Sequence, residues 1–346
     1  MPLSIPGPIR LRLPRHKADW TMKNTLVTVF GGSGFLGRYT VRTLARRGYR
    51  IRVAVRYPNL ANYLLPMGQP GQIQILKTDV TEPEQVAAAL RGTALAVNLT
   101  GILYARGRQS FEAVHSGAAG LIARSAHDAG VRRLVHISAL GADTAAESDY
   151  ARTKAEGEAR VRAAFPDATI LRPSLLVGPE DEFFNRFAWL ARFSPILPLI
   201  GGGKTRFQPT AAWDVAEAVA RSLERLETPG NIYELGGSKV YSFRDLMELM
   251  LREIGRKRVL LPVPYGLATL KAFFLQFLPN PLLTPDQVRL LKTDSVVAEG
   301  AKTFADLEIV PEDIESAVPH YLWRFRREGQ FSPGAPDRFN PAASLQ

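Results

Sequence analysis

The 346-residue sequence contains no cysteine and only five histidines. The lack of cysteine excludes disulfides, thiolate metal sites, iron–sulfur clusters and cysteine nucleophiles, and it is compatible with a reducing cytoplasm. The histidines are scattered without the spacing of metal ligands, so we predict no metal site. No run approaches the roughly eighteen uncharged apolar residues of a membrane-spanning helix, so we predict no transmembrane helix.

Acidic residues are in the minority. The chain has 44 lysines and arginines against 33 aspartates and glutamates, a formal net charge of +11. This excess favours an acidic partner such as an anionic lipid surface. Nucleic acid is not predicted, because the basic residues are dispersed and no known binding motif is present. The 46% hydrophobic and 22% charged residues indicate a globular protein, long enough for one large α/β domain and a smaller lobe.

The sequence divides into four predicted regions. Residues 1–22 contain four prolines and four lysines or arginines, which interrupt any secretory signal. We predict a disordered basic arm there, or a start at Met22. Residues 23–180 are expected to form an NAD(P)-binding Rossmann domain, and residues 181–326 a C-terminal lobe partly interleaved with its sheet. Residues 327–346 are predicted to be a disordered tail.

Strand and helix patterns alternate along the first domain, as in a doubly wound parallel Rossmann sheet. The expected strands are residues 25–30, 50–55, 73–77, 94–98, 133–137 and 231–235. The expected helices are residues 38–47, 83–91, 111–129 and 212–224.

Three glycines spaced three apart, Gly31, Gly34 and Gly37, lie between the first strand and the first helix. Gly31 is expected to allow a tight turn, Gly34 to let the backbone approach a pyrophosphate, and Gly37 to let the helix pack closely on the sheet. The helix N-terminus supplies an anion site. The segment therefore predicts a dinucleotide phosphate cradle, which also includes Ser33, Phe35 and Leu36.

The acid that would select NAD is missing, since no aspartate or glutamate occurs from Gly31 to Gly71. In NAD-binding proteins an acid at the end of the second strand binds the ribose 2′-hydroxyl. That position is Arg56 here, and Arg38 follows the last glycine, so two guanidinium groups could bind a 2′-phosphate. We therefore predict NADP(H) in preference to NAD(H). The alternative interpretation of Arg56 is a solvated loop residue.

The ends of the third and fourth strands supply further predicted cofactor contacts. Asp79, followed by Val80, falls at the carboxyl end of the third strand, where it could accept a hydrogen bond from the adenine amine. The alternative role for Asp79 is to cap the following helix. After the fourth strand, Leu99, Thr100 and Gly101 would let the backbone pass close to the cofactor ribose.

A second constellation combines Ser138, at the end of the fifth strand, with Tyr150 and Lys154. The four-residue spacing places the tyrosine and the lysine on one face of a helix. A nearby ammonium favours the phenolate form, which would make proton exchange with a substrate alcohol or carbonyl feasible. Lys154 could also bind the nicotinamide ribose, and Ser138 would hold the substrate oxygen.

Together, the glycine segment, Ser138 and the Tyr150/Lys154 pair resemble the extended or atypical short-chain dehydrogenase/reductases. Within that superfamily, four segments are similar to the nucleotide-binding accessory subunits of respiratory complex I (NADH:ubiquinone oxidoreductase) and their bacterial relatives. These segments are His136–Ala142, Tyr150–Glu158, Leu171–Ser174 and Gly178–Phe187. The resemblance runs from about residue 23 to residue 326, and Pro173 within it is a further predicted cofactor contact.

The resemblance implies a protein that holds NADP(H) permanently and stabilises the joint of complex I near the quinone site, without an established redox step of its own. The implied location is cytoplasmic and peripheral, on the inner face of the energy-transducing membrane, with complex I subunits as partners. The alternative is an active NADP-dependent reductase, epimerase or dehydratase acting on a quinone precursor or another small carbonyl compound. A nucleotide sensor is a third class.

The segment Tyr265–Leu278 is apolar, with large aromatics and one lysine, and it is too short to span a bilayer. An interfacial helix in lipid, a helix docked on a membrane subunit and an ordinary buried helix would all show this pattern. The basic net charge favours the membrane surface.

Overall fold

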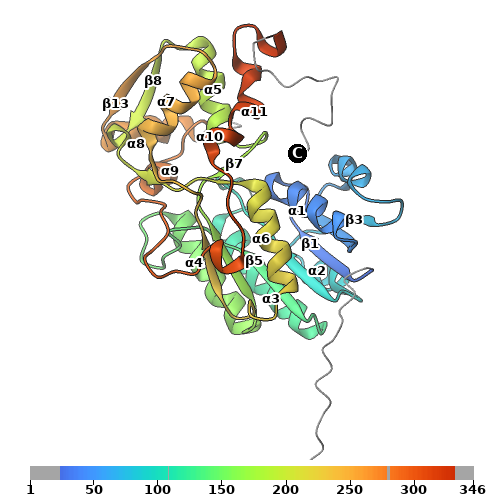
Figure 1. Ribbon diagram of the computed structural model, residues 1–346. Helices are drawn as coiled ribbons and strands as arrows, with labels where there is room; N and C mark the ends of the chain where they lie inside the picture. The colour runs from blue at the N-terminus through green and yellow to red at the C-terminus, as the bar shows by residue number, and fades with distance from the viewer. Residues whose placement is uncertain (1–23, 108, 279–280, 332–346) are drawn as a thin grey trace, which may run out of the picture.

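The computed structural model describes residues 24–107, 109–278 and 281–331. A parallel sheet with helices on both faces forms the larger domain, and a smaller, mainly helical lobe lies at one end of it (Figure 1). The predicted arm, residues 1–22, lies outside the described residues, as does most of the predicted tail.

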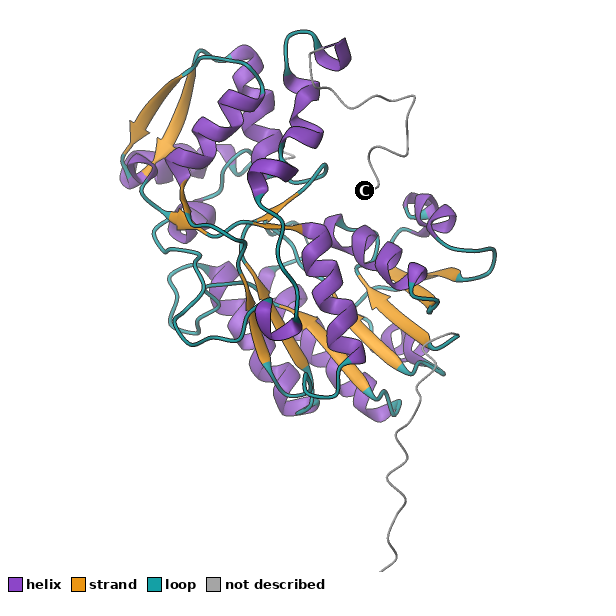
Figure 2. Ribbon diagram, in the orientation of Figure 1, coloured by secondary structure: helices purple, strands orange, loops and turns teal. Residues whose placement is uncertain are grey.

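Seven parallel strands make the main sheet (Figure 2). They are β1 (Leu26–Phe30), β2 (Arg50–Val55), β3 (Ile73–Lys77), β4 (Leu95–Asn98), β5 (Arg133–Ile137), β6 (Thr169–Pro173) and β11 (Ile232–Leu235). Their order is β11-β6-β5-β4-β1-β2-β3, so the direction of winding reverses between β1 and β4. This confirms the predicted doubly wound Rossmann sheet, whose ligand crevice lies outside the carboxyl ends of the strands at that reversal.

Each face of the sheet has its own apolar core. The helices are α1 (Phe35–Arg46) and α6 (Ala212–Glu224) on one face, and α2 (Pro83–Leu90), α3 (Ala118–Asp128) and α4 (Asp149–Ala164) on the other. On the first face, α1 and α6 pack side by side and bury leucine, valine and alanine side chains against the sheet. Short 3₁₀ turns, Pro58–Leu60 and Asn62–Met67, follow β2.

The lobe has a separate core of aromatic and aliphatic side chains. Its helices are α5 (Phe183–Phe193), α7 (Phe243–Glu253), α8 (Tyr265–Leu275), α9 (Pro285–Leu290), α10 (Ile314–Ala317) and α11 (Pro319–Leu322). Its strands pair as β8 (Ile196–Ile200) with β13 (Val259–Val263), β7 (Leu176–Val177) with β10 (Thr210–Ala211), and β9 (Arg206–Phe207) with β12 (Tyr241–Ser242). Short 3₁₀ turns are Gly201–Gly203, Ala305–Leu307, Trp323–Phe325 and Gly329–Phe331. No helix in the described residues combines the length and the apolar character needed to cross a bilayer.

The helix predicted over residues 111–129 is divided. Its first part, Glu112–Gly117, is a π-helix, and α3 begins only at Ala118. The π-helix packs tightly on α4, where a Cβ added to Gly157 would lie 2.1 Å from the carbonyl oxygen of His115. The sequence shows the apolar face of this segment, whereas the wider turn accompanies a contact with a helix about forty residues later.

We predict that Gly157→Ala destabilises the protein. The added methyl group would overlap a backbone carbonyl, and overpacking of this kind costs about 1 to 3 kcal/mol. Gly266→Ala in α8 is the matched control, because nothing lies within 4 Å of its added Cβ, so stability should be unchanged or slightly increased. Urea unfolding of both variants measures the difference, and equal midpoints would contradict the packing argument.

Candidate functional site

The glycine-rich turn joins β1 to α1 at the carboxyl edge of the sheet. Gly31 has a φ of +76°, and a Cβ there would lie 3.1 Å from the carbonyl carbon of Leu99. A Cβ on Gly37 would lie 2.4 Å from the carbonyl oxygen of Gly31. The first and third glycines are therefore required by the turn itself, and the third allows α1 to pack directly on that turn.

Gly34 has a different role, because the fold does not require a glycine there. It is the N-cap of α1, with an ordinary extended backbone (φ −76°, ψ −176°), and no side chain of the described residues caps the helix. Its added Cβ would approach only the carbonyl oxygen of Gly31, at 3.3 Å. The residue is exposed at a helix N-terminus whose first N–H groups have no intrahelical acceptor. This arrangement fits the pyrophosphate of a dinucleotide.

Other residues of the predicted cradle lie close to this turn. Phe35 and Leu36 line the large cavity described below. The carbonyl oxygen of Ser33 accepts a hydrogen bond from the hydroxyl of Tyr63, at 2.7 Å. The side chains that follow the glycines therefore face the ligand crevice, and the hydrogen bond from Tyr63 fixes the backbone of the turn.

The two predicted phosphate-binding arginines differ in their surroundings. Arg56 is exposed and lines the cavity, with its guanidinium 5.6 Å from the ring centroid of Tyr57. Arg38 donates a hydrogen bond to Glu180 at 2.8 Å, and its guanidinium lies 5.0 Å from the ring centroid of Tyr63. Sequence reasoning missed Glu180, which is far from Arg38 in the chain. A 2′-phosphate would compete with this carboxylate for Arg38, whereas Arg56 is accessible.

The residues that follow β3 do not cap α2. The carboxylate of Asp79 accepts hydrogen bonds from the backbone N–H of Thr81, at 3.0 Å, and from its hydroxyl, at 2.7 Å. The N-cap of α2 is Glu82. Val80 is buried in the core beneath the sheet. Binding of adenine by Asp79 and Val80 stays a prediction.

The turn after β4 is fixed by Asn98, whose side-chain oxygen accepts hydrogen bonds from the N–H of Thr100, at 3.0 Å, and from its hydroxyl, at 2.6 Å. A Cβ on Gly101 would lie 3.3 Å from Nζ of Lys154. The glycine therefore leaves room for the lysine, a reason that the sequence did not reveal.

Ser138, Tyr150 and Lys154, the residues of the predicted constellation, all line the large cavity. The Nζ atom of Lys154 donates a hydrogen bond to the carbonyl oxygen of Ile137, at 3.2 Å, and lies 6.0 Å from the ring centroid of Tyr150. Ser138 is 3% exposed, and its hydroxyl has no hydrogen-bond partner among the described residues. Pro173 lines the same cavity. The cluster can present hydroxyl donors to a substrate oxygen.

Burial determines the protonation of this cluster. It raises the pKa of Tyr150 to about 12, and it lowers the pKa of Lys154 to about 8, although Glu158 opposes that change. The lysine was expected to favour the phenolate, but burial is the cause of the shift in the pKa of Tyr150 in this geometry. At neutral pH Tyr150 is therefore a phenol, the form that donates a proton to a carbonyl oxygen.

His115 supports the tyrosine, and sequence reasoning missed it. Its ring packs edge-on against Tyr150 at 5.1 Å between centroids. Its Nε2 atom accepts a hydrogen bond from the N–H of Ile102, at 3.0 Å. Burial, together with the charge of Lys154, lowers the pKa of His115 to about 2. A neutral histidine thus ties the turn after β4 to the tyrosine ring.

Asp286, on α9 of the lobe, accepts hydrogen bonds from the start of the helix that carries Tyr150, whose N-cap residue is Ser148. One carboxylate oxygen accepts from the N–H of Asp149, at 2.6 Å, and the other accepts from the hydroxyl of Ser148, at 3.0 Å, and the N–H of Tyr150, at 3.1 Å. Asp286 lies more than a hundred residues from this helix, so no local sequence signal indicates the contact. The lobe therefore positions the predicted catalytic helix.

A cavity of about 1360 Å³ lies between the domain and the lobe. Its domain side includes Ser138, Tyr150 and Lys154, and its lobe side is lined largely by aromatic and aliphatic residues. This volume is larger than the roughly 300 to 1,000 Å³ of typical small-molecule sites.

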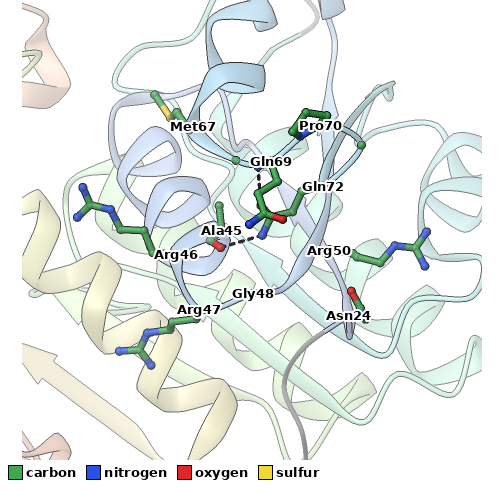
Figure 3. Close-up of a pocket in the computed structure, with 12 residues that line it drawn as sticks. Asn24, Ala45, Arg46, Arg47, Gly48, Arg50, Met67, Gln69, Pro70 and Gln72 are labelled. Atoms are coloured by element: carbon green, nitrogen blue, oxygen red, sulfur yellow. Dashed lines mark hydrogen bonds between the residues drawn. The ribbon is translucent and has the colours of Figure 1, made fainter.

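A second hollow of about 800 Å³ lies at the opposite edge of the sheet, between the end of α1 and the start of β2 (Figure 3). Gln72 is one of its lining residues. The side-chain amide of Gln72 donates hydrogen bonds to the carbonyl oxygens of Ala45, at 2.8 Å, and Tyr49, at 2.9 Å. The glycine-rich turn is at the other end of α1, so this hollow is separate from the predicted nucleotide site.

The fold and the glycine turn define a dinucleotide-binding protein, and comparison with known proteins agrees. The profile of the NAD(P)H-binding family matches residues 31–225, so the chain belongs to that family. The solved structure of an NADPH-dependent quinone oxidoreductase from Escherichia coli, in complex with NADPH, has a TM-score of 0.68 at 19% identity, and the match covers 85% of this chain and 99% of the other. At this identity the likeness shows the fold alone.

Curated relatives identify the branch. The mitochondrial NADH dehydrogenase [ubiquinone] 1 alpha subcomplex subunit 9 of Arabidopsis thaliana is 34% identical over 321 residues, 89% of this chain and 80% of the relative. The ceramide reductase of Caulobacter vibrioides is 30% identical over 242 residues, 69% of this chain and 74% of the relative. The chain belongs to the family of complex I alpha subcomplex subunit 9 proteins, as the sequence resemblance predicted.

We predict that Asp286→Ala lowers the free energy of unfolding by about 0.5 to 2 kcal/mol, comparable to the loss of a helix N-cap, because the first N–H groups of α4 lose their acceptor. The exposed acid Glu299 provides the control, since Glu299→Ala should change stability by less than about 0.5 kcal/mol. Denaturant unfolding measures both variants. Equal stability of the Asp286→Ala variant and the wild type would show that these hydrogen bonds do not hold α4.

Proposed function

We propose that this protein is an NADP(H)-binding accessory or assembly subunit of respiratory complex I, located at the joint near the quinone site, with a mainly structural nucleotide. The observation that carries the proposal is the match, over most of the chain, to complex I subunits that are about 30% identical or more. The open helix N-terminus at Gly34 supports nucleotide binding independently of that match.

The proposed location is cytoplasmic and peripheral, on the inner face of the energy-transducing membrane. The lobe provides a suitable surface, because α8 buries only Ala268 and Ala272, while Leu270, Phe273 and Phe274 are more than half exposed. An apolar face of this size calls for a partner. No aspartate or glutamate occurs between residues 254 and 285, so an anionic lipid surface would meet no like charge there.

The NADP(H) preference is tested by Arg56→Glu. Because Arg56 is exposed and lines the cavity, the wild type should bind NADPH more tightly than NADH. Loss of one charge-assisted phosphate contact should weaken NADPH binding by about 1.5 to 3 kcal/mol, roughly ten- to a hundred-fold. Calorimetry with both nucleotides measures the effect. Equal wild-type affinities for NADPH and NADH would refute the preference.

A second candidate function is an NADP-dependent reductase that acts on a carbonyl compound, such as a quinone precursor. The intact cluster of Ser138, Tyr150 and Lys154 favours it, because structural nucleotide binding alone needs no proton donor. The relative with the name ceramide reductase supports it too. Bound NADPH would supply a hydride to the carbonyl carbon. Tyr150, a phenol at neutral pH, would donate the proton to the carbonyl oxygen, and Ser138 would hold that oxygen by a hydrogen bond.

Two substitutions distinguish the candidates. Gly34→Val should abolish nucleotide retention while preserving the fold, because the backbone angles at this residue are ordinary and its added Cβ would press only on the carbonyl oxygen of Gly31, at 3.3 Å, which a small shift relieves. Tyr150→Phe should preserve nucleotide retention and complex assembly, since only a hydroxyl group is lost. If the protein is a reductase, Tyr150→Phe should lower turnover by roughly 10² to 10⁴.

Both variants are compared for bound nucleotide, for incorporation into the respiratory complex in native gels, and for NADPH oxidation with quinone-like carbonyl compounds. Normal assembly of the Gly34→Val protein, after loss of its nucleotide has been verified, would contradict a structural role for NADP(H). That result would favour the enzyme.

A further inference from the structure

The lobe lines the cavity with many aromatic and aliphatic side chains, which a small polar substrate would not need. Its lining includes Phe183, Phe187, Leu190, Phe207 and Phe243. Four of these residues belong to one network of ring contacts, in which Phe183 lies 5.3 Å from Phe187 and 5.7 Å from Phe243 between centroids. The hydroxyl groups of Ser138 and Tyr150 line the same cavity from the domain. The lining therefore combines hydroxyl groups of the domain with a mainly apolar lobe surface, which also carries the charged side chains of Glu182, Arg186 and Lys271.

The lobe side of the cavity opens on the surface that α8 exposes. Ile196, Leu261 and Leu282 line the cavity and are also 46%, 50% and 48% exposed, so the cavity is open at these residues, as it is at Leu103 on the domain side, which is 45% exposed. From α8 itself, Ala268, Lys271 and Leu275 contribute to the lining. The opening at the lobe is thus continuous with the exposed apolar side chains of α8 and of β13.

Charge at this surface also suits a membrane. Exposed Lys257 and Lys271 flank the apolar residues, and Arg192 lies exposed at the end of α5. With no acid between residues 254 and 285, the face combines apolar side chains with cations, the pattern of an anionic lipid interface. A ligand that enters through Ile196 and Leu261 would therefore come from the lipid phase.

We propose that the cavity binds a single-chain region of a membrane lipid, with an oxygenated end at Ser138 and Tyr150 and a hydrocarbon chain along the lobe. The ligand class is a long-chain ketone or the corresponding alcohol. This inference rests on the proposed function only for the membrane location and for the use of Ser138 and Tyr150 at the oxygen end. Chain binding needs neither complex assembly nor turnover.

The test uses the full chain in detergent-free buffer, with cis-parinaric acid as a fluorescent long-chain probe. Butan-2-one, octan-2-one, dodecan-2-one and hexadecan-2-one compete for its site. Each methylene transferred from water to an apolar wall should raise affinity about threefold to fourfold, until the chain fills the cavity. An affinity that does not depend on chain length overturns the proposal.

Two substitutions on β13 distinguish ketone binding in the cavity from binding at the exposed surface. Leu261→Glu places a charge at the opening at the lobe and should weaken dodecan-2-one binding by about tenfold or more. Val259→Glu is the matched control, because Val259 is 61% exposed on the same face of β13 but does not line the cavity. It should leave ketone binding unchanged. Equal weakening by both substitutions overturns the proposal, and Ile196→Glu replaces Leu261→Glu should that variant fail to fold.

Further measurements test the lipid site and the proposed function separately. Co-sedimentation with phosphatidylglycerol vesicles should fall in both glutamate variants, since each adds a negative charge to the exposed face. Ketone binding that is normal in a protein that does not bind NADPH would refute the proposed function and leave the lipid site standing. NADPH binding and complex assembly without chain-length dependence would refute the lipid site alone.

Discussion

The backbone contact between α1 and the glycine turn is the constraint on which the nucleotide site depends. Because Gly37 lacks a Cβ, α1 starts directly against the carbonyl oxygen of Gly31, a distance that no side chain would allow. The helix N-terminus is thereby held at the carboxyl edge of the sheet, beside the point between β1 and β4 where the winding reverses. The same contact leaves Gly34 exposed in front of the first turn. The fold thus requires glycine at positions 31 and 37 of the motif, while Gly34 leaves the predicted pyrophosphate site open.

The lobe is part of the site as well as a cover for it. Asp286 accepts hydrogen bonds from the start of α4 and so positions Tyr150, while Glu180 pairs with Arg38 at the start of α1. Both carboxylates come from beyond β6 and act on helices of the Rossmann domain. A change in how the lobe packs would therefore alter the positions of both the predicted catalytic tyrosine and the predicted phosphate-binding arginine.

The chemistry of the cluster is compatible with both candidate functions. Burial keeps Tyr150 in its phenol form and brings the pKa of Lys154 down to about 8. A phenol beside a serine hydroxyl is suited to proton donation, and the same groups can hold an oxygenated ligand without any reaction. The cavity extends this argument, because its mainly apolar lobe surface favours a lipid-like ligand in either case. The relatives divide in the same way, between subunits of complex I and a ceramide reductase.

The sequence alone determined the sheet, the glycine turn and the Ser138, Tyr150 and Lys154 constellation, because each depends on short-range periodicity or spacing. Strand 50–55 and helix 212–224, for example, have the bounds that local pattern predicted. Tertiary structure alone decided the rest, because the partners are distant in the chain. Glu180 competes for Arg38, Asp286 holds the start of α4, and His115 packs on Tyr150 from a π-helix whose wide turn accompanies close packing against Gly157. Burial also depends on the whole fold. It raises the pKa of Tyr150, whereas the neighbouring lysine had led us to expect a favoured phenolate.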